Sequence, residues 1–162
     1  MAGTEPGIGR IGIGKRLRLA HMAFSRALRL ELAKHDVTFG QFVHLEQLWN
    51  EDGLTQTELS RRIGIESASS TSILEQLEQH GLIDRPRNGR DRRKVNVHLT
   101  EKGAALQPAL FGAAKKVNRI AQSELTPDEV VALISILNRM TESIAAEYPG
   151  SNSVDARARL GG

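Results

Sequence analysis

A basic run between Arg85 and Lys94 holds the side chains with the clearest chemistry in this 162-residue sequence. The run reads RPRNGRDRRK and contains six basic residues against one acid. Guanidinium and ammonium groups at this density can neutralise phosphates and release counterions from a nucleic acid, which makes binding depend on salt. The same composition also suits a solvated surface loop. Taken alone, the run leaves both interpretations open.

A second polar set lies in the serine- and threonine-rich stretch that begins at Ser67. With a helical period of 3.6 residues, one face of this stretch holds the core candidates Ser70, Ile73, Leu74 and Leu77. The opposite face offers hydroxyl and amide groups, which can bond to base edges and phosphates. Its members are Ser67, Ser69, Ser72 and Gln76, with Thr71 near the margin. The alternative is that the stretch is only a poor helix start.

Motifs for catalysis and metal binding are missing from the sequence. Without cysteine the chain has no disulfide framework, no thiolate nucleophile and no cysteine-type zinc site. Its five histidines lack metal-ligand spacing, and we find no serine-hydrolase, Walker or dinucleotide-binding motif. We therefore expect a protein that is not an enzyme and that uses no cofactor and no metal.

Three segments begin with the same helix-start signal. In each, a threonine is followed three positions later by Gln or Glu, and two apolar residues flank the pair. The hydroxyl can accept a hydrogen bond from an unpaired backbone N–H, while the apolar pair sets the entry angle of the chain. The segments are Val37–Phe42, Leu54–Leu59 and Leu125–Val130, and Pro127 strengthens the last one.

Six helices are predicted from these starts and from the helical period. They cover about residues 13–34, 41–49, 55–63, 67–79, 100–123 and 127–147. Pro108 lies inside the fifth helix, where its missing N–H and its ring should kink or loosen a turn. Gly81 stands where a left-handed cap is expected after the fourth helix. A short third helix, a tight turn and a longer fourth helix form a helix-turn-helix candidate.

After Gly81 the hydrophobic period changes to two. A short strand begins at Leu82, and Val95–Leu99 alternates between apolar and polar residues. Asn88-Gly89, inside the basic run, is typical of a hairpin turn, so the run becomes the tip of a wing. The predicted fold class is therefore mainly α with a small β wing, built as a winged helix-turn-helix lobe with a two- to three-stranded antiparallel sheet.

In such a fold the second helix of the motif enters the major groove, and the hairpin reaches the DNA backbone or the minor groove. The predicted contacts to double-stranded DNA come from three polar segments. They are Thr55 and Gln56, then Ser67, Ser69, Thr71, Ser72 and Gln76, then Arg85, Arg87, Arg90, Asp91, Arg92, Arg93 and Lys94. Our hypothesis for Asp91 is that it holds Arg93 extended for a narrow minor groove.

Two motifs resemble one known family. They are LTQTELSRRIGI, at Leu54–Ile65, and GLIDRPRNGRDRRKVNVHLTEKG, at Gly81–Gly103. Between about Leu17 and Glu147 the chain resembles the MarR-type transcriptional regulators. The resemblance implies an obligate homodimer in which the first, fifth and sixth helices interlock, while each winged lobe reads half of a pseudo-palindromic operator.

The resemblance also implies a division of the chain. Residues 12–35 and 101–148 would form a helical dimerisation region, and residues 36–100 the DNA-binding lobe. A flexible N-terminus is expected at residues 1–11. The tail at residues 149–162 is small and polar and is expected to be disordered.

The fourth helix departs from the family pattern. It carries Glu66, Glu75 and Glu78 but no Lys or Arg, where relatives often have a basic residue at the position of Ser72. Relatives also usually have an aliphatic residue at the position of Ser70. Because of these differences, we expect the wing and the symmetric pairing of two lobes to supply more of the DNA affinity than the fourth helix does.

Family members commonly repress transcription and are released by small, often aromatic and anionic ligands. In this sequence the residues that would converge at the family's pocket are His21, Phe24, Phe42, Leu45 and Trp49. His21 is our candidate for the polar anchor of an aromatic carboxylate or its thioester. The same aromatic residues equally suit a hydrophobic core, and His21 equally suits a hydrogen-bonded core histidine. The position of His44 stays open.

No apolar run is long enough to span a bilayer, and residues 1–10 lack the order of a secretory signal. We therefore expect a cytoplasmic protein that does not bind membranes. The sequence favours a ligand-responsive transcriptional regulator that acts as a repressor. The alternatives are a ligand-independent architectural or constitutive DNA-binding protein and a winged helix that binds protein.

Overall fold

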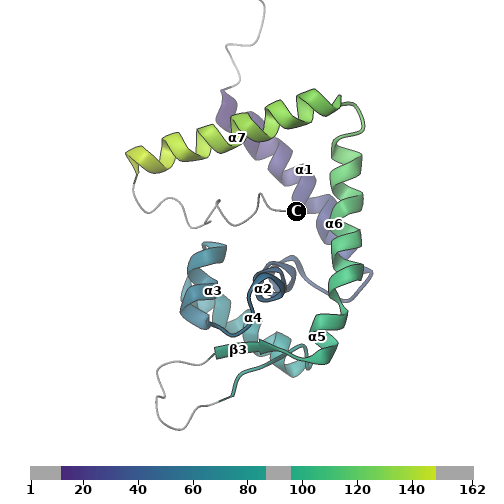
Figure 1. Ribbon diagram of the computed structural model, residues 1–162, viewed down its shortest axis with the longest axis vertical. Helices are drawn as coiled ribbons and strands as arrows, with labels where there is room; N and C mark the ends of the chain where they lie inside the picture. Colours follow the sequence, from purple (N-terminus) through teal and green to yellow (C-terminus); the bar gives the residue numbers. More distant parts are fainter. Residues whose placement is uncertain (1–11, 87–95, 149–162) are drawn as a thin grey trace, which may run out of the picture.

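The computed structural model describes residues 12–86 and 96–148, and within them it contains seven α-helices and a three-stranded sheet (Figure 1). The helices are α1 (Ile13–Ala33), α2 (Phe39–Asn50), α3 (Gln56–Ile63), α4 (Ser67–Gln79), α5 (Glu101–Ala105), α6 (Gln107–Ala121) and α7 (Pro127–Glu147). The strands are β1 (Leu54–Thr55), β2 (Ile83–Asp84) and β3 (Asn96–Leu99). The mainly helical class with a small sheet is confirmed. The predictions for the N-terminus, the wing tip and the tail lie outside the described residues.

All three predicted capping boxes are present. In α2 the Gln41 N–H donates to Thr38 Oγ1 at 3.2 Å, and the Thr38 N–H donates to Gln41 Oε1 at 2.9 Å. The same reciprocal pair of bonds opens α3 at Thr55 and α7 at Thr126. These bonds satisfy N–H groups that have no partner inside the helix. Local sequence is therefore enough to set where these helices begin.

Two glycines end the helices of the helix-turn-helix. Gly64 follows α3 with φ 78°, and Gly81 lies two residues after α4 with φ 67°. A positive φ costs glycine little because it has no Cβ. The turn between α3 and α4 is only residues 64–66 long. The predicted short helix, tight turn and longer helix are confirmed.

The predicted fifth helix is divided into two helices at Pro108. α5 ends at Ala105, and α6 begins at Gln107 with Pro108 in its first turn. A proline in the first turn loses no intrahelical hydrogen bond, because the N–H groups there have no helical partner. The expected disturbance is confirmed, and it takes the form of a break.

The sheet has the strand order β1-β3-β2, and both pairs are antiparallel. Leu54 pairs with Val97, and Ile83 pairs with Leu99. All three of the residues Leu54, Ile83 and Val97 are buried, so the sheet closes one side of the lobe's core. β1 overlaps the capping box that begins α3, because Thr55 belongs to both. The sequence therefore indicated the start of the helix and not the strand.

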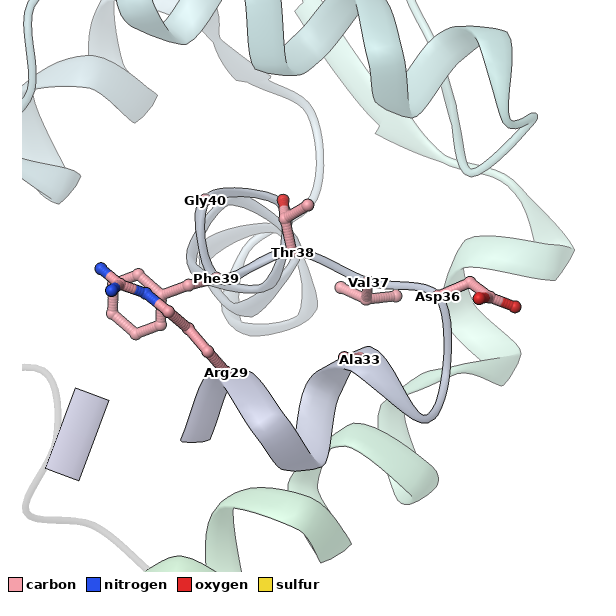
Figure 2. Close-up of a pocket in the computed structure, with 7 residues that line it drawn as sticks. All are labelled: Arg29, Ala33, Asp36, Val37, Thr38, Phe39 and Gly40. Atoms are coloured by element: carbon pink, nitrogen blue, oxygen red, sulfur yellow. The ribbon is translucent and has the colours of Figure 1, made fainter. Parts of the chain in front are cut away.

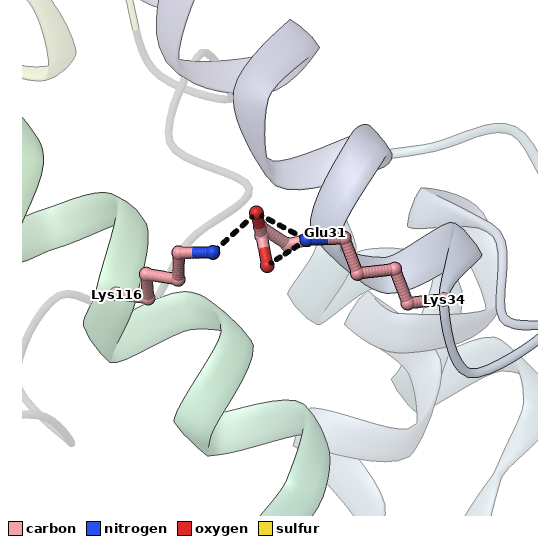
Figure 3. A network of polar contacts seen from close by, with 3 residues as sticks. All are labelled: Glu31, Lys34 and Lys116. Atoms are coloured by element: carbon pink, nitrogen blue, oxygen red, sulfur yellow. Dashed lines mark hydrogen bonds and ion pairs between the residues drawn. The ribbon is translucent and has the colours of Figure 1, made fainter.

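α1 connects the lobe to α6, along which it packs (Figure 1). Beside this contact Glu31 accepts a hydrogen bond from Lys34 at 2.8 Å and another from Lys116 of α6 at 2.9 Å (Figure 3). These bonds, first that from Lys34 and then that from Lys116, hold the pKa of the Glu31 carboxyl below its ordinary value. The cluster ties two helices that are far apart in the sequence.

Candidate nucleic-acid interface

α4 has one buried face and one exposed face, as predicted. The buried face holds Ser70, Leu74 and Leu77, each with 0% exposure, and Ile73 packs against the same core. The predicted contact residues are placed on the other side: Ser67, Ser69, Ser72 and Gln76 are exposed, and Thr71 is half-buried. A helix with this division can place hydroxyl and amide groups against base edges in a groove.

Thr55 uses its hydroxyl group within the protein. Its Oγ1 donates to Glu58 Oε2 at 2.7 Å and accepts from the Glu58 N–H at 3.3 Å. The bonds from the Thr55 hydroxyl and backbone lower the pKa of the Glu58 carboxyl because they stabilise its charged form. The structure thus gives Thr55 a structural role at the start of α3.

Gln56, the next residue, contacts α4. Its Nε2 donates to Thr71 Oγ1 at 2.6 Å, and Thr71 Oγ1 donates in turn to the Ser67 carbonyl oxygen at 2.9 Å. Two predicted DNA contacts from different helices, Gln56 and Thr71, are therefore brought together.

A buried glutamine of α2 contacts the other end of the exposed face. Gln41 is 2% exposed, and its Nε2 donates to Gln76 Oε1 at 3.5 Å. The Oε1 of Gln41 already accepts from Thr38, which orients its amide group. The capping signal located Gln41 in the sequence, but its contact with Gln76 spans 35 positions and had no local signal.

Arg85 is paired with Glu78 of α4. Its Nε donates to Glu78 Oε2 at 3.0 Å, its terminal nitrogen contacts the same oxygen, and its side chain is 18% exposed. A guanidinium group held in this way is less available to a phosphate. The other wing candidates, Arg87, Arg90, Asp91, Arg92, Arg93 and Lys94, lie outside the described residues.

A histidine of α2 bonds to the buried face of α4. His44 and Ser70 are both 0% exposed, and His44 Nε2 lies 3.0 Å from Ser70 Oγ. His44 Nδ1 lies 2.7 Å from the Gly40 carbonyl oxygen, which can only accept. We therefore assign the proton to Nδ1, so that Nε2 accepts from the Ser70 hydroxyl. Burial lowers the pKa of His44, which favours this neutral form.

The five candidates for an effector pocket fall into two groups. Phe42 and Leu45 are buried in the core of the lobe, and Trp49 Nε1 donates to the Gly103 carbonyl oxygen at 3.1 Å. The Trp49 ring makes edge contacts with Phe42 and with Phe111 of α6, at centroid distances of 6.4 and 5.3 Å. His21 and Phe24 line a groove that the other three candidates do not line, although Phe24 also packs against the same core, so the structure does not bring all five to one cavity.

His21 and Phe24 line an apolar groove of about 720 Å³ between α1, α6 and α7. His21 is exposed, and its Nε2 lies 3.3 Å from Ser25 Oγ. Most of the remaining lining comes from aliphatic side chains such as Leu17, Leu133 and Leu137. The groove therefore has one imidazole and two amide groups, those of Asn118 and Gln122, in a mainly apolar wall.

α7 contributes little to the core of the single chain. Among the described residues, those of α7 are all at least partly exposed to solvent. Its exposed large apolar residues are Val131, Leu133, Ile134, Ile136 and Ile144. In Figure 1, α7 runs across the ends of α6 and α1, away from the lobe that holds α2, α3 and α4. Exposed apolar surface is a feature of interaction sites, so α7 is a candidate interaction surface.

A second cavity, of about 590 Å³, lies where α1 meets the start of α2 (Figure 2). Arg29 stands over the ring of Phe39 at 5.7 Å from its centroid. Asp36 and Thr38 complete the polar part of the wall. None of these residues was predicted to bind a ligand.

Neither a metal site nor a membrane span is found in the parts of the chain that the structure describes. Residues 12–86 and 96–148 contain no group of three His, Asp or Glu side chains that could hold a metal ion. Within the same ranges, every helix is too short or too polar to cross a bilayer.

The model of the MarR family matches residues 37–95 of the chain. Among curated proteins, the chain is 34% identical over 136 residues to the HTH-type transcriptional regulator TtmR of Methylorubrum extorquens, covering 81% of this chain and 69% of the relative. It is 30% identical over 131 residues to the HTH-type transcriptional repressor NicR of Pseudomonas putida, covering 81% and 83%.

Solved structures are similar over the same extent. A mutant MarR from E. coli in complex with operator DNA has a TM-score of 0.73 and 26% identity, covering 79% of this chain and 92% of that one. BpsR of Bordetella bronchiseptica, whose DNA binding is regulated by 6-hydroxynicotinic acid, has a TM-score of 0.74 and 26% identity, covering 79% and 97%.

Proposed function

This chain belongs to the MarR family of DNA-binding transcriptional regulators and is not an enzyme, and from this premise we propose that it binds a pseudo-palindromic operator as a homodimer and represses transcription. The observation that carries the proposal is the exposed hydroxyl and amide face of α4, opposite its buried face. In the proposed complex each α4 enters a major groove and reads one half-site.

The proposed interface divides its work between α4 and the wing. Ser67, Ser69, Ser72 and Gln76 have exposed groups that can bond to base edges or phosphates. The wing residues Arg87, Arg90, Arg92, Arg93 and Lys94 provide the positive charge that α4 lacks. We keep the hypothesis that Asp91 orients Arg93.

The exposed apolar residues of α7 support the homodimer. A second copy that covered them would remove apolar surface from water, at about 25 cal/mol per Å². We therefore propose that residues 12–35 and 101–148 form the dimerisation region and residues 36–100 the DNA-binding lobe. Two α4 helices held at a fixed spacing would match two half-sites, which is what a pseudo-palindrome requires.

An aromatic carboxylate or its thioester is the proposed effector. The groove beside His21 and Phe24 combines mainly apolar walls with one imidazole and the amides of Asn118 and Gln122, which suits an aromatic ring that carries an anionic group. The regulation of BpsR by 6-hydroxynicotinic acid supports the same chemical class. A ligand that binds better to a dimer with wrongly spaced α4 helices would release the operator by a population shift.

A regulator works where the DNA is, which supports the expected cytoplasmic location. The repressor role is supported by the similarity to NicR, which is named as a repressor. The cytoplasmic location and the repressor role are both part of the proposal.

Fluorescence anisotropy tests the function. The full chain is titrated onto labelled duplex from upstream of its own gene and onto a scrambled duplex, with and without a panel of aromatic acids and their thioesters. We expect a lower Kd for the upstream duplex and release by at least one ligand. Ligand affinity of the variant His21→Ala, measured on the free protein, tests the proposed anchor, because an unchanged affinity removes His21 from that role.

Other outcomes contradict the proposal in distinct ways. Equal binding to both duplexes with a steep salt dependence would mean an architectural DNA-binding protein. Preference for the upstream duplex that no ligand abolishes would mean a constitutive regulator. Absence of DNA binding at moderate salt would point to a winged helix that binds protein.

A further inference from the structure

The two halves of α4 are anchored to the protein in different ways. The C-terminal half buries Leu74 and Leu77 at 0% exposure, with Ile73 packed beside them. In the structure described, the N-terminal half, Ser67–Ser72, buries no apolar side chain, because its one buried residue is Ser70. The half that would present Ser67, Ser69 and Ser72 to bases therefore lacks the usual apolar anchor.

Local sequence does little to hold this half in place. Five of its six residues are Ser or Thr, which favour a helix interior less than straight-chain residues do. Within the described part of the chain, the N-cap residue Glu66 makes no side-chain cap bond, unlike the threonines that open α2, α3 and α7. The contacts that position Ser67–Ser72 must come from other helices.

Two hydrogen bonds supply such contacts, and we call them the polar clamp. One joins His44 of α2 to Ser70 at 3.0 Å, and the other joins Gln56 of α3 to Thr71 at 2.6 Å. Close packing of α2 on α4 allows the first, since a Cβ at Gly40 would lie 2.9 Å from Ile73 Cδ1. The two bonds therefore connect consecutive residues of α4, Ser70 and Thr71, to two different helices.

We propose that His44 and Gln56 are positioning residues for sequence discrimination, because the polar clamp fixes the rotation of the N-terminal half of α4. Hydrogen bonds suit this task since their energy depends on angle as well as distance, whereas apolar contacts are not directional. His44 acts from the core, and its neutral imidazole accepts from a serine that has no route to DNA. The proposal rests on the proposed DNA-binding function and adds to it two residues that position α4, His44 of α2 and Gln56 of α3.

The first test of the clamp measures how well the variant Ser70→Ala discriminates between two DNA duplexes. The readout is the ratio of Kd on the scrambled duplex to Kd on the upstream duplex, measured by anisotropy at one salt concentration. We expect this ratio to fall about three- to tenfold, the factor that one net hydrogen bond supplies. Affinity for the scrambled duplex should stay within about twofold, since phosphate contacts carry it.

The matched control is Ile73→Val, which removes one methyl group from the apolar anchor of α4. It should lower thermal stability and leave the ratio unchanged. A ratio that is unchanged in Ser70→Ala, or that falls equally in Ile73→Val, overturns the clamp. A wild type that prefers neither duplex overturns the proposed regulator itself, so the two failures are distinguishable.

Amide hydrogen exchange tests the clamp without DNA. This measurement can therefore include a variant of Gln56, which is also a candidate DNA contact. In Ser70→Ala and in Gln56→Met, the backbone amides of residues 70–72 should exchange at least about threefold faster. The amides of Leu74 and Leu77 should keep their wild-type rates. Equal acceleration along the whole of α4, or none at Ser70–Ser72, overturns the proposal.

Discussion

At the scale of single residues, the polar side chains around α4 differ in what they are free to do. Arg85 was predicted as a phosphate contact from its place in the basic run, yet it is paired with Glu78. Thr55 was predicted as a DNA contact, yet its hydroxyl caps α3. Ser67, Ser69 and Ser72 stay exposed. The structure thus separates predicted contacts whose side chains are bonded within the protein from predicted contacts whose side chains are exposed.

Salt dependence should distinguish Arg85 from the rest of the wing. Because Glu78 holds its guanidinium, Arg85→Ala should leave the slope of log Kd against log salt close to the wild-type slope. Arg90→Ala and Arg92→Ala should each reduce this slope by about one phosphate contact. The slopes are measured by anisotropy at several salt concentrations. A reduction for Arg85→Ala as large as for Arg90→Ala would contradict the pairing.

His44 should make the stability of the protein depend on pH. Burial lowers its pKa in the folded state below the ordinary value of about 6.5. Between the two pKa values the unfolded chain binds the proton and the folded chain does not, so the free energy of unfolding falls as the pH drops below about 6.5. The loss continues down to the lowered pKa. Urea unfolding between pH 7.5 and about 5 measures it.

Two variants test whether this pH dependence of stability arises from His44. The double variant His44→Leu/Ser70→Ala removes the imidazole and its partner together and should lose most of this slope. The single variant Ser70→Ala keeps the buried imidazole and should keep the slope. If the double variant retains the wild-type slope, the pH dependence arises from other groups.

At the scale of elements, the short helix α3 depends on its cap. It has only eight residues, which is too few to be stable alone in water. Thr55 and Glu58 exchange hydrogen bonds at its start, and Gly64 ends it. The turn that follows sets the direction of α4, so the cap contributes to the placement of its exposed polar face.

Thr55→Ala should lower the free energy of unfolding by about 1 kcal/mol, because it leaves the backbone N–H of Glu58 without its partner. Urea denaturation at a fixed protein concentration measures the change. Thr57→Ala is the matched control, since Thr57 is exposed on the same helix. Equal losses in the two variants would mean that the capping box adds nothing.

At the scale of the whole molecule, one hydrophobic core joins the lobe to α1 and α6, while α7 exposes apolar side chains. Leu45, Leu59 and Leu74 are fully buried in the lobe. In α7, by contrast, Ile134 is 47% exposed and Ile144 is 52% exposed. In the single chain α7 therefore has an exposed apolar surface, which the proposed dimer would cover.

Ile134→Glu should convert the proposed dimer to a monomer, because a carboxylate would lie in an apolar interface without a partner. Sedimentation velocity measures the mass, and anisotropy should show the loss of operator preference. Ser135→Glu adds the same charge about 100° further around α7, on its polar side, and should stay dimeric. A monomeric wild type, or an unchanged mass for Ile134→Glu, would refute the proposed interface.

The sequence by itself determined the features that depend on neighbours within a few positions. These include the three capping boxes, the glycine after α4, the disturbance at Pro108 and the two faces of α4. Such features are readable because the backbone groups that need partners, and the residues that supply them, lie within one or two helical turns.

Only the tertiary structure decided what the side chains of α4 and the aromatic residues contact. The bonds from His44 to Ser70 and from Trp49 to Gly103 join residues 26 and 54 positions apart. The split of the pocket candidates between the core and the groove also depends on how α1, α6 and α7 pack. No local pattern encodes these pairings, because they form only when helices from distant parts of the chain meet.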